Sequence, residues 1–386
     1  MDVQALRDLV APREEEFVEA LGELVAIDSG SFTPDGVNAV ADRCEARMRA
    51  GGWEVERRPH EPGPGEPQLG DLLIGRLRGD GGPRILLVGH MDTVFDPGTA
   101  AERPFRVDRR TAYGPGVSDM KGGLLLGWFA VETLQRAGFS SFEQITYVCN
   151  PDEEIGSPFS APVIRALAPE HDAAFVLESA RANGDIVSAR KGVTDYAVAF
   201  EGRAAHAGVE PEKGRSAVLA AAHATVALQA LNDRWPGVTV NVGVIRGGTR
   251  PNVVPAACEL QIDVRAPTED LLATAEQEVD RLLATPAVED VRVHVRANAW
   301  HRPMEKTEAT ARLARIATRL AEELGFTLRD AATGGASDAN TTSAAGTPTL
   351  DGLGPVGGDD HSPSEWIDLG SIVPRTALLA GLIANV

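Results

Sequence analysis

The stretch RILLVGHMDTV, residues 84–94, decides how the first half of the chain is interpreted. It begins with a short apolar run, which is typical of a strand buried in a parallel sheet. His90 and Asp92 come directly after that run. Open α/β sheets carry their functional groups beyond the carboxyl ends of their strands. The stretch therefore predicts a strand that delivers an imidazole and a carboxylate to a functional edge.

Two further apolar runs have the same arrangement. We expect strands at 144–149 and 173–177; Glu153 and Glu154 follow the first, and Glu178 follows the second. Because parallel strands end at the same edge of a sheet, these carboxylates are expected to meet His90. A single glutamate after a strand is usually solvated, so the prediction depends on the whole set.

Helical patterns alternate with these strands. Apolar residues recur at helical spacing, and glycines stop two of the runs. The expected helices cover 14–27, 37–50, 120–137, 307–324 and the residues from about 372 onward. This alternation predicts an α/β fold with a mainly parallel sheet.

The middle of the chain has a different pattern. At 386 residues the chain is too long for one ordinary domain. From Gly192 the order of expected elements is β-α-β-β-α-β, as in a ferredoxin-like unit. Helix–strand alternation then resumes. We therefore predict one α/β domain over 1–190 and 301–386, with an inserted α+β domain over 191–300.

Composition excludes some classes of partner. The net charge of −19 disfavours binding to nucleic acid or to anionic lipid. No apolar stretch is long enough to span a membrane, and the N-terminal residues lack the apolar core of a signal peptide. Cys44, Cys149 and Cys258 form no CxxC pair, which favours a reducing compartment. We expect a cytoplasmic protein.

The residue types at the predicted edge suit a pair of divalent cations. Carboxylates and imidazoles without thiolates favour Zn²⁺, with Mn²⁺ or Co²⁺ as alternatives. Two such ions polarise a carbonyl and lower the pKa of a water between them. One member of the pair Glu153 and Glu154 should bind metal, and the other should act as general base. Asp92 can fix the tautomer of His90.

Five motifs occur in a recognisable order. They are GHMDTV, AYGPGVSDMKGG, PDEEIGS, VLES and the segment DDHSPSEW around His361. From about Leu86 onward the chain resembles the di-zinc exopeptidase family of glutamate carboxypeptidase, acetylornithine deacetylase, succinyl-diaminopimelate desuccinylase and aminoacylase. It is most similar to the bacterial branch that cleaves folates. The DMKGG form is shared with the deacylases, so that motif does not separate the two activities.

The resemblance implies roles for the residues of the predicted edge. Asp119 would bridge two metal ions. His90 and Glu178 would hold one ion, and Glu154 and His361 the other. In the same way Glu153 would be the general base, Asp92 would orient His90, and the Asp119–Met120 peptide bond would be cis.

For the inserted domain, the resemblance implies a lid that also joins two subunits. His206 would reach the partner's site and steady the oxyanion, although a surface histidine is the simpler reading. Asn252 and Arg265 would bind the substrate carboxylate, and Arg302 is a weaker candidate of the same kind. Arg265 could equally be paired with a nearby acid. The backbone N–H groups of Gly334 and Gly335 could bind a carboxylate or form a tight turn.

These expectations define a function and its rivals. We expect a zinc-dependent amidohydrolase that forms a homodimer. It would release a C-terminal amino acid from an N-acyl, peptidyl or folate-like conjugate with a free carboxylate, and glutamate is the leading candidate for that amino acid. One rival is an N-acyl-amino-acid deacylase with the same machinery. Another is a catalytically idle paralogue that acts as a binding or scaffold protein. No ligand or base is missing, which counts against the idle paralogue.

Overall fold

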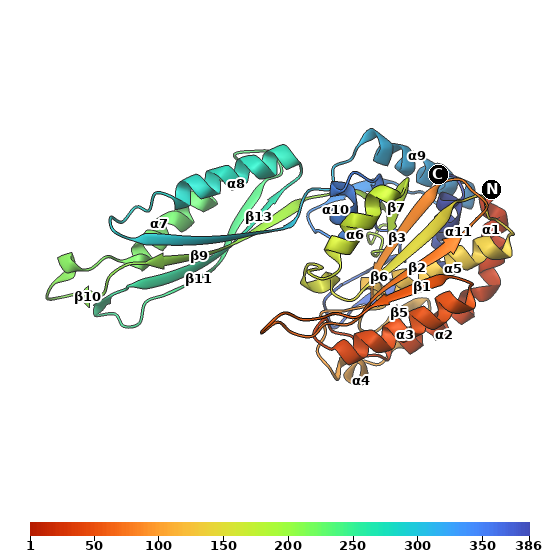
Figure 1. Cartoon of the computed structure of the whole chain (residues 1–386), viewed down its shortest axis with the longest axis horizontal. Helices are drawn as coiled ribbons and strands as arrows, with labels where there is room; N and C mark the ends of the chain where they lie inside the picture. The colour runs from red at the N-terminus through yellow and green to blue at the C-terminus, as the bar shows by residue number, and fades with distance from the viewer. The chain divides into compact units, whose positions relative to one another are not determined.

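The chain forms two units, and the second is inserted into the first. The computed structural model describes residues 1–386 except the side chains of Ala299 and Trp300. Unit 1 comprises Met1–Ser188, Lys306–Ala332 and Ser337–Val386; unit 2 comprises Ala189–Glu305 and Thr333–Ala336. Figure 1 shows both units with their elements labelled.

The boundary of unit 2 differs in detail from the prediction of 191–300. The unit extends over Ala189–Glu305 and also includes the short segment Thr333–Ala336. This segment contacts residues of unit 2 that are distant in sequence. The Nη1 atom of Arg265, for example, donates to the carbonyl of Gly334 at 2.9 Å. Sequence patterns do not reveal that such a segment belongs to a distant domain.

The central sheet of unit 1 has the strand order β1-β2-β6-β3-β7-β16. Strand β3 is parallel to both β6 and β7, β16 is parallel to β7, and β2 is antiparallel to its two neighbours, β6 and the edge strand β1. This confirms the predicted mainly parallel sheet. The bounds are β1 Glu54–Arg58, β2 Leu72–Arg78, β3 Arg84–His90, β6 Gln144–Asn150, β7 Ala173–Val176 and β16 Thr349–Leu350.

Helices lie on both faces of this sheet (Figure 1). Helix α5 is buried at most of its positions, as expected for a helix packed against β3, α2 and α11. The predicted helices are confirmed, and α1 is an additional one. The bounds are α1 Val3–Val10, α2 Glu14–Val25, α3 Pro34–Ala50, α4 Thr99–Glu102, α5 Gly122–Arg136, α6 Ala161–Leu167, α9 Glu308–Leu324, α10 Asp338–Ala344 and α11 Ile372–Ile383.

Smaller elements complete unit 1. A four-stranded sheet has the order β17-β18-β5-β4, and β15 pairs with β8. The strands are β4 Arg106–Asp108, β5 Thr111–Tyr113, β8 Ile186–Arg190, β15 Asp330–Thr333, β17 Gly357–Gly358 and β18 Trp366–Asp368. The short helical turns are η1 Ala11–Arg13, η2 Val117–Lys121, η3 Glu153–Ile155, η4 Ala168–Glu170 and η6 Leu369–Ser371.

Unit 2 is an antiparallel sheet covered by helices on one face. Its strand order is β11-β13-β9-β14, and α7 and α8 pack on the sheet. If the four strands are numbered by their order along the chain, the sheet starting from β14 has the order four-one-three-two, as in ferredoxin-like units. The elements are β9 Gly192–Glu201, β10 Ala205–His206, η5 Pro211–Lys213, α7 Ala217–Gln229, β11 Thr239–Gly247, β12 Val253–Val254, β13 Ala257–Ala266, α8 Glu269–Leu283 and β14 Arg292–His301.

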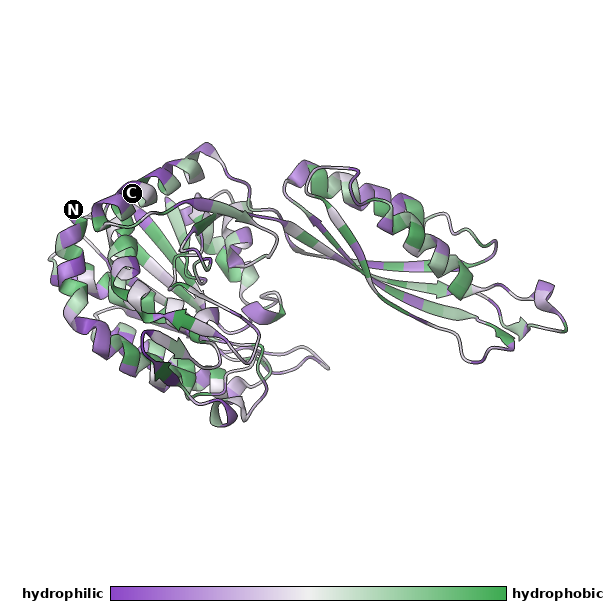
Figure 2. Ribbon diagram, turned by 180° about the vertical axis from the view of Figure 1, so that it is seen from behind, coloured by the Kyte–Doolittle hydropathy of each residue, from purple (hydrophilic) through white to green (hydrophobic). Residues whose placement is uncertain are grey.

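Alternation along the strands explains why one face of this sheet carries helices. On β9, Tyr196, Val198 and Phe200 are buried in the core of unit 2, and the residues between them are more exposed. Figure 2 shows the same mixture of hydrophobic and hydrophilic residues along the strands. Within the described part of the chain, the helices are too short or too polar to cross a lipid bilayer.

Candidate metal centre

The edge of the central sheet collects polar side chains from three neighbouring strands. His90 is the last residue of β3, and Glu178 lies two residues beyond the end of β7. After β6, the turn η3 carries Glu153 and Glu154. Because β3, β6 and β7 are parallel, their carboxyl ends meet at one edge.

Asp119 lies between two imidazoles. Its Oδ1 is 2.9 Å from Nε2 of His90, and its Oδ2 is 3.1 Å from Nε2 of His361. The Asp119–Met120 peptide bond is cis, as expected from the resemblance. Asp119 thus presents one oxygen to each imidazole, which is the arrangement needed by a carboxylate that bridges two cations.

Each of the two imidazoles has a further carboxylate near it. Nε2 of His90 is 3.7 Å from Oε1 of Glu178, and Nε2 of His361 is 3.1 Å from Oε2 of Glu154. Ligand atoms of His90, Asp119 and Glu154 lie within 4.8 Å of one another, and so do those of His90, Glu153 and Glu178. Imidazole nitrogens and carboxylate oxygens at this spacing are suitable ligands for zinc.

One oxygen of Glu154 supports this interpretation. Its Oε1 is buried and has no hydrogen-bond partner among the described residues. A buried carboxylate oxygen without a partner is unfavourable unless another group satisfies it. A cation bound between Glu154 and His361 would satisfy it.

The pKa shifts show how the protein without metal balances these charges. Contacts with Asp119, and then with Glu154, raise the pKa of His361 to about 10. Burial opposes the charged ring of His90, but Asp119 and Asp92 raise its pKa well above the usual value. Burial acts to raise the pKa of Asp119, yet the two imidazoles hold it below its usual range. Protonated imidazoles therefore occupy the place of cations.

Asp92 ties the imidazole to the glutamate turn. Nδ1 of His90 is 2.9 Å from the backbone oxygen of Asp92 and 3.4 Å from its Oδ1. The Asp92 carboxylate accepts hydrogen bonds from the hydroxyl of Ser31 and from the N–H groups of Glu153 and Glu154 at 2.7, 3.1 and 3.2 Å. The nearest acceptor for the ring is thus the backbone of Asp92, while its side chain fixes η3.

Glu153, the predicted general base, lies among the carboxylates at this edge. It shares a cluster with His90 and Glu178 and is not one of the groups paired with His361. Burial, and then the charge of Glu178, raise the pKa of Glu153 well above its usual value. A carboxylate with a raised pKa is a stronger proton acceptor than an ordinary one.

Comparison with known proteins agrees with this geometry. The model of peptidase family M20/M25/M40 matches residues 86–385. The chain belongs to peptidase family M20/M25/M40. Carboxypeptidase G2 of Pseudomonas sp. (strain RS-16) is 29% identical over 371 residues, covering 95% of this chain and 88% of that protein.

Other members of the M20 family are similar over most of the chain. An acetylornithine deacetylase of Myxococcus xanthus is 31% identical over 281 residues, covering 68% of this chain and 71% of that protein. The crystal structure of aminopeptidase PepT from Bacillus cereus has a TM-score of 0.80 at 24% identity, covering 96% of this chain and 98% of that chain. That likeness shows the M20 fold. Enzymes of this family use a metal ion, usually zinc.

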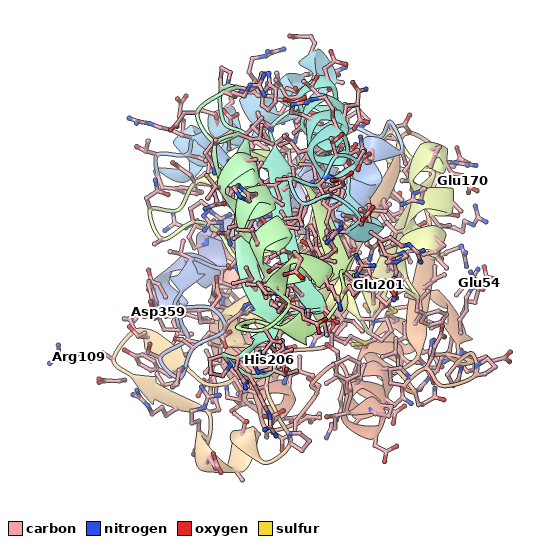
Figure 3. The ribbon with its side chains drawn as sticks, turned by 90° about the vertical axis from the view of Figure 1, so that its left-hand side faces the viewer. Glu54, Arg109, Glu170, Glu201, His206 and Asp359 are labelled. Carbon is pink, nitrogen blue, oxygen red and sulfur yellow. The ribbon has the colours of Figure 1, made fainter. Side chains whose placement is uncertain are left out.

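The predicted lid residues His206 and Asn252 lie in unit 2, on a two-stranded ribbon. His206 of β10 pairs with Val253 of β12, and the carbonyl of Asn252 accepts a hydrogen bond from Ala207 at 3.0 Å. Both side chains are exposed. Figure 3 labels His206, which lies at the end of unit 2 that carries β10. The ribbon therefore presents an imidazole and an amide together.

The two predicted arginines of unit 2 are paired with acids. Nε and Nη2 of Arg265 donate to Asp263, each at 2.9 Å. Arg302 donates to Glu269 at 2.8 Å and to Glu276 at 3.0 Å. For Arg265 the alternative of pairing with a nearby acid is therefore realised. Arg302 has acidic partners as well.

Gly334 and Gly335 lie next to this cluster of charges. The carbonyl of Gly334 accepts from Arg265 at 2.9 Å, and that of Gly335 accepts from Arg190 at 3.0 Å. These contacts use the carbonyl oxygens of the glycines. The predicted role of their N–H groups stays a prediction.

Sequence reasoning missed Glu365, which holds the loop that carries Asp119. The side chain is only 2% exposed. Its carboxylate accepts hydrogen bonds from the N–H groups of Gly116, Ser118 and Asp119 at 2.8, 2.8 and 3.0 Å. Glu365 follows His361 by four residues, so one short segment carries this imidazole and also fixes the loop of Asp119.

Asp338 is a second residue that sequence reasoning missed. It is buried and accepts a hydrogen bond from the hydroxyl of Ser157 at 2.7 Å and another from the amide of Asn150. Burial raises the pKa of Asp338 to about 7. Asp338 thus joins α10 to the segment that carries Glu153 and Glu154.

Replacing Glu365 should weaken metal binding. In Glu365→Gln an amide NH₂ replaces one acceptor oxygen, so at least one N–H of the 116–119 loop loses its partner and Asp119 is less firmly placed. We expect zinc affinity, measured by competition with a chromophoric chelator, to fall about tenfold or more. Glu308→Gln on the exposed surface of α9 should bind zinc like the wild type. Unchanged affinity in Glu365→Gln would show that these hydrogen bonds do not position the ligand.

Zinc binding should be stronger at higher pH. The imidazoles of His90 and His361 have raised pKa values and hold protons at neutral pH, and zinc binds only the neutral ring. Raising the pH from 6 to 8 removes competing protons, so the Kd should fall. Calorimetric titrations in two buffers of different ionisation enthalpy should detect proton release. A Kd that is independent of pH, with no protons released, would contradict this charge assignment.

Proposed function

We propose that this M20 protein is a two-zinc hydrolase that removes a C-terminal amino acid from an N-acyl, peptidyl or folate-like conjugate. Glutamate is the leading candidate for that amino acid. The observation that carries the proposal is the Asp119 carboxylate between His90 and His361, with one oxygen directed to each. The similarity to carboxypeptidase G2 over 95% of the chain supports the carboxypeptidase activity.

The chain's own residues account for the binding of two ions. Asp119, His90 and Glu178 would hold one ion, and Asp119, Glu154 and His361 the other. When bound, the two ions polarise the substrate carbonyl and make a water molecule easier to ionise. The network from Asp92 and Glu365 keeps these side chains in place through backbone N–H groups.

Glu153 moves the proton in this scheme. Its carboxylate takes a proton from the attacking water and later gives that proton to the departing amide nitrogen. Burial and the charge of Glu178 raise the pKa of Glu153, which makes it a stronger proton acceptor. We assign to His206 a hydrogen bond to the developing oxyanion.

The substrate carboxylate needs a local cationic or N–H partner because the chain carries a net charge of −19. We assign this role to Asn252 and Arg265, with the N–H groups of Gly334 and Gly335. Arg265 lies beside Gly334, and its side chain remains 36% exposed although it is paired with Asp263. Arg302 is a weaker candidate since two acids bind it.

A deacylase is the second candidate. The acetylornithine deacetylase of Myxococcus xanthus is 31% identical to this chain, slightly more than carboxypeptidase G2 over a shorter region. Both reactions break an amide bond to an amino acid, so they differ in the acyl group and not in the metal centre.

The three cysteines are free and buried, which supports our assignment to a reducing compartment such as the cytoplasm.

We also propose that unit 2 pairs with a second copy of the chain. Helix α7 packs beside the edge strand β11, and both expose large apolar side chains. Leu219 and Val226 of α7 are 50% and 72% exposed, and Ile245 of β11 is 50% exposed. Apolar side chains beside an unpaired strand edge favour association with an identical surface.

Removing the base should separate chemistry from metal binding. In Glu153→Ala the predicted metal ligands remain, so we expect near-normal zinc content and a kcat lower by several orders of magnitude. The assay measures glutamate release from an N-acyl-glutamate and metal by elemental analysis. Glu289→Ala, in the loop before β14, is the control. Full activity of Glu153→Ala would remove Glu153 from the mechanism, and fewer than one ion per wild-type chain would favour the idle paralogue.

A charge on α7 should disrupt the proposed dimer. Val226→Glu places a carboxylate in the apolar surface. Because Val226 is largely exposed, the variant subunit should still fold. Sedimentation velocity should show a dimer for the wild type and for Thr274→Glu on α8, and a monomer for Val226→Glu. If His206 acts in the partner's site, the monomer should also have a lower kcat. A wild-type monomer, or a Val226→Glu dimer, would contradict the assignment.

A further inference from the structure

Helix α11 carries a charged side chain into the interior of unit 1. Arg375, in the first turns of this helix, is only 2% exposed. Burial lowers the pKa of Arg375 to about 10, so the guanidinium is still protonated at neutral pH. A buried charge is unfavourable unless hydrogen bonds satisfy it. The contacts of Arg375 must therefore offset a substantial desolvation cost.

The guanidinium donates to backbone carbonyls of two segments outside α11. Nη1 donates to Gly184, in the turn before β8, at 2.9 Å. Nη2 donates to Gly352 at 2.6 Å, and Nε donates to Gly354, both in the segment after β16. A planar fork of several N–H groups can reach three separate carbonyls, whereas a lysine presents a single nitrogen. The geometry of this contact thus depends on an arginine.

The segment that the guanidinium fixes, residues 352–356, runs beside the backbone of Glu178. The N–H of Gly354 donates to the carbonyl of Glu178 at 2.8 Å. Two residues further along, the N–H of Ala180 donates to the carbonyl of Pro355 at 2.9 Å. The backbone that carries the Glu178 carboxylate is therefore hydrogen-bonded on both sides of that residue to a segment whose own carbonyls bind a buried cation.

The contact between these two segments leaves no room for adjustment. A Cβ atom added to Gly354 would lie 2.7 Å from the carbonyl oxygen of Leu177 and 2.8 Å from that of Glu178. The N–H of Leu177 in turn donates to the carbonyl of Val88 in β3 at 3.0 Å. Because the packing is this close, a displacement of the 352–356 segment would be transmitted to Glu178.

The connection reaches one side of the candidate metal centre. Oε1 of Glu178 lies 3.7 Å from Nε2 of His90, so a shift of its backbone would change the spacing of two predicted ligands of one ion. Glu154, on the other side, is held differently, because its N–H donates to the carboxylate of Asp92. The two predicted ligand sets thus depend on separate hydrogen-bond networks.

We propose that Arg375 is a positioning residue for Glu178, and that it sets the affinity of the metal site formed by His90, Asp119 and Glu178 without setting that of the second site. The inference rests on the proposed function, because it needs Glu178 to bind a metal ion. Arg375 contacts neither the ion nor the substrate in this scheme. It acts through the backbone of the 352–356 segment.

Arg375→Lys tests the inference, because it keeps the charge and loses the fork. In a zinc titration by competition with a chromophoric chelator, one of the two binding steps should weaken about tenfold or more and the other should be unchanged. Arg13→Lys is the matched control, since Arg13 is 5% exposed and pairs with Glu16 of α2 and Glu132 of α5. Both variants should have a lower Tm, but Arg13→Lys should bind both ions like the wild type.

A double-mutant cycle shows whether Arg375 acts through Glu178. Glu178→Gln should weaken the same binding step, and adding Arg375→Lys should then cause little further loss, because the two changes affect one contact. If Arg375→Lys does not fold, Gly354→Ala takes its place in the titration and in the cycle, since its Cβ displaces the same segment.

Three results would overturn the inference: unchanged zinc binding in the variant, equal weakening of both steps, or additive losses in the cycle. A wild-type chain that binds fewer than two zinc ions would instead contradict the proposed function.

Discussion

The structure depends on holding several like charges close together at one sheet edge. Asp119 lies between two imidazoles, with Glu154 beside that of His361 and Glu178 beside that of His90. Carboxylates so close repel one another, and burial adds a desolvation cost. Such a cluster is stable only when positive charge is supplied. In the protein without metal, protons on His90 and His361 supply it, and those protons must leave when a metal binds.

The fold meets this requirement with backbone N–H groups. The carboxylates of Asp92 and Glu365 bind the N–H groups of η3 and of the 116–119 loop, respectively. Each fixes a segment that bears a metal ligand without adding a side chain to the cluster. Short links between a buried carboxylate and backbone donors are strong because the acceptor is charged.

The sequence was sufficient for those parts that depend on local pattern. The run at 84–88 has the apolar character of a buried parallel strand, and it becomes β3 with His90 at its end. The pairing of Arg265 with an acid, one of its two predicted alternatives, is also local, since Asp263 is two residues away on the same face of β13. Helix α1 was passed over although Asp2 caps its N-terminus. In each of these cases the signal lies within a few residues.

Long-range contacts gave no such signal. Glu365 and Asp119 are 246 positions apart, and Ser157 and Asp338 are 181 apart, so neither hydrogen bond leaves a trace in spacing or periodicity. The assignment of Thr333–Ala336 to unit 2 has the same origin, because it depends on arginines that are distant in sequence. The clustering of acidic and imidazole side chains at one sheet edge could be predicted, whereas the contacts of Glu365 and Asp338 could not.

The hydrogen bonds that order these loops also affect metal binding. If the ligand loops were ordered only by the metal, each binding event would include the entropy cost of fixing them, about 1–2 kcal/mol per residue. Here Glu365 already satisfies the N–H of Asp119, and Asp92 already satisfies those of Glu153 and Glu154. Hydrogen bonds therefore order the loops beforehand, and less of the free energy of metal binding is lost to fixing them.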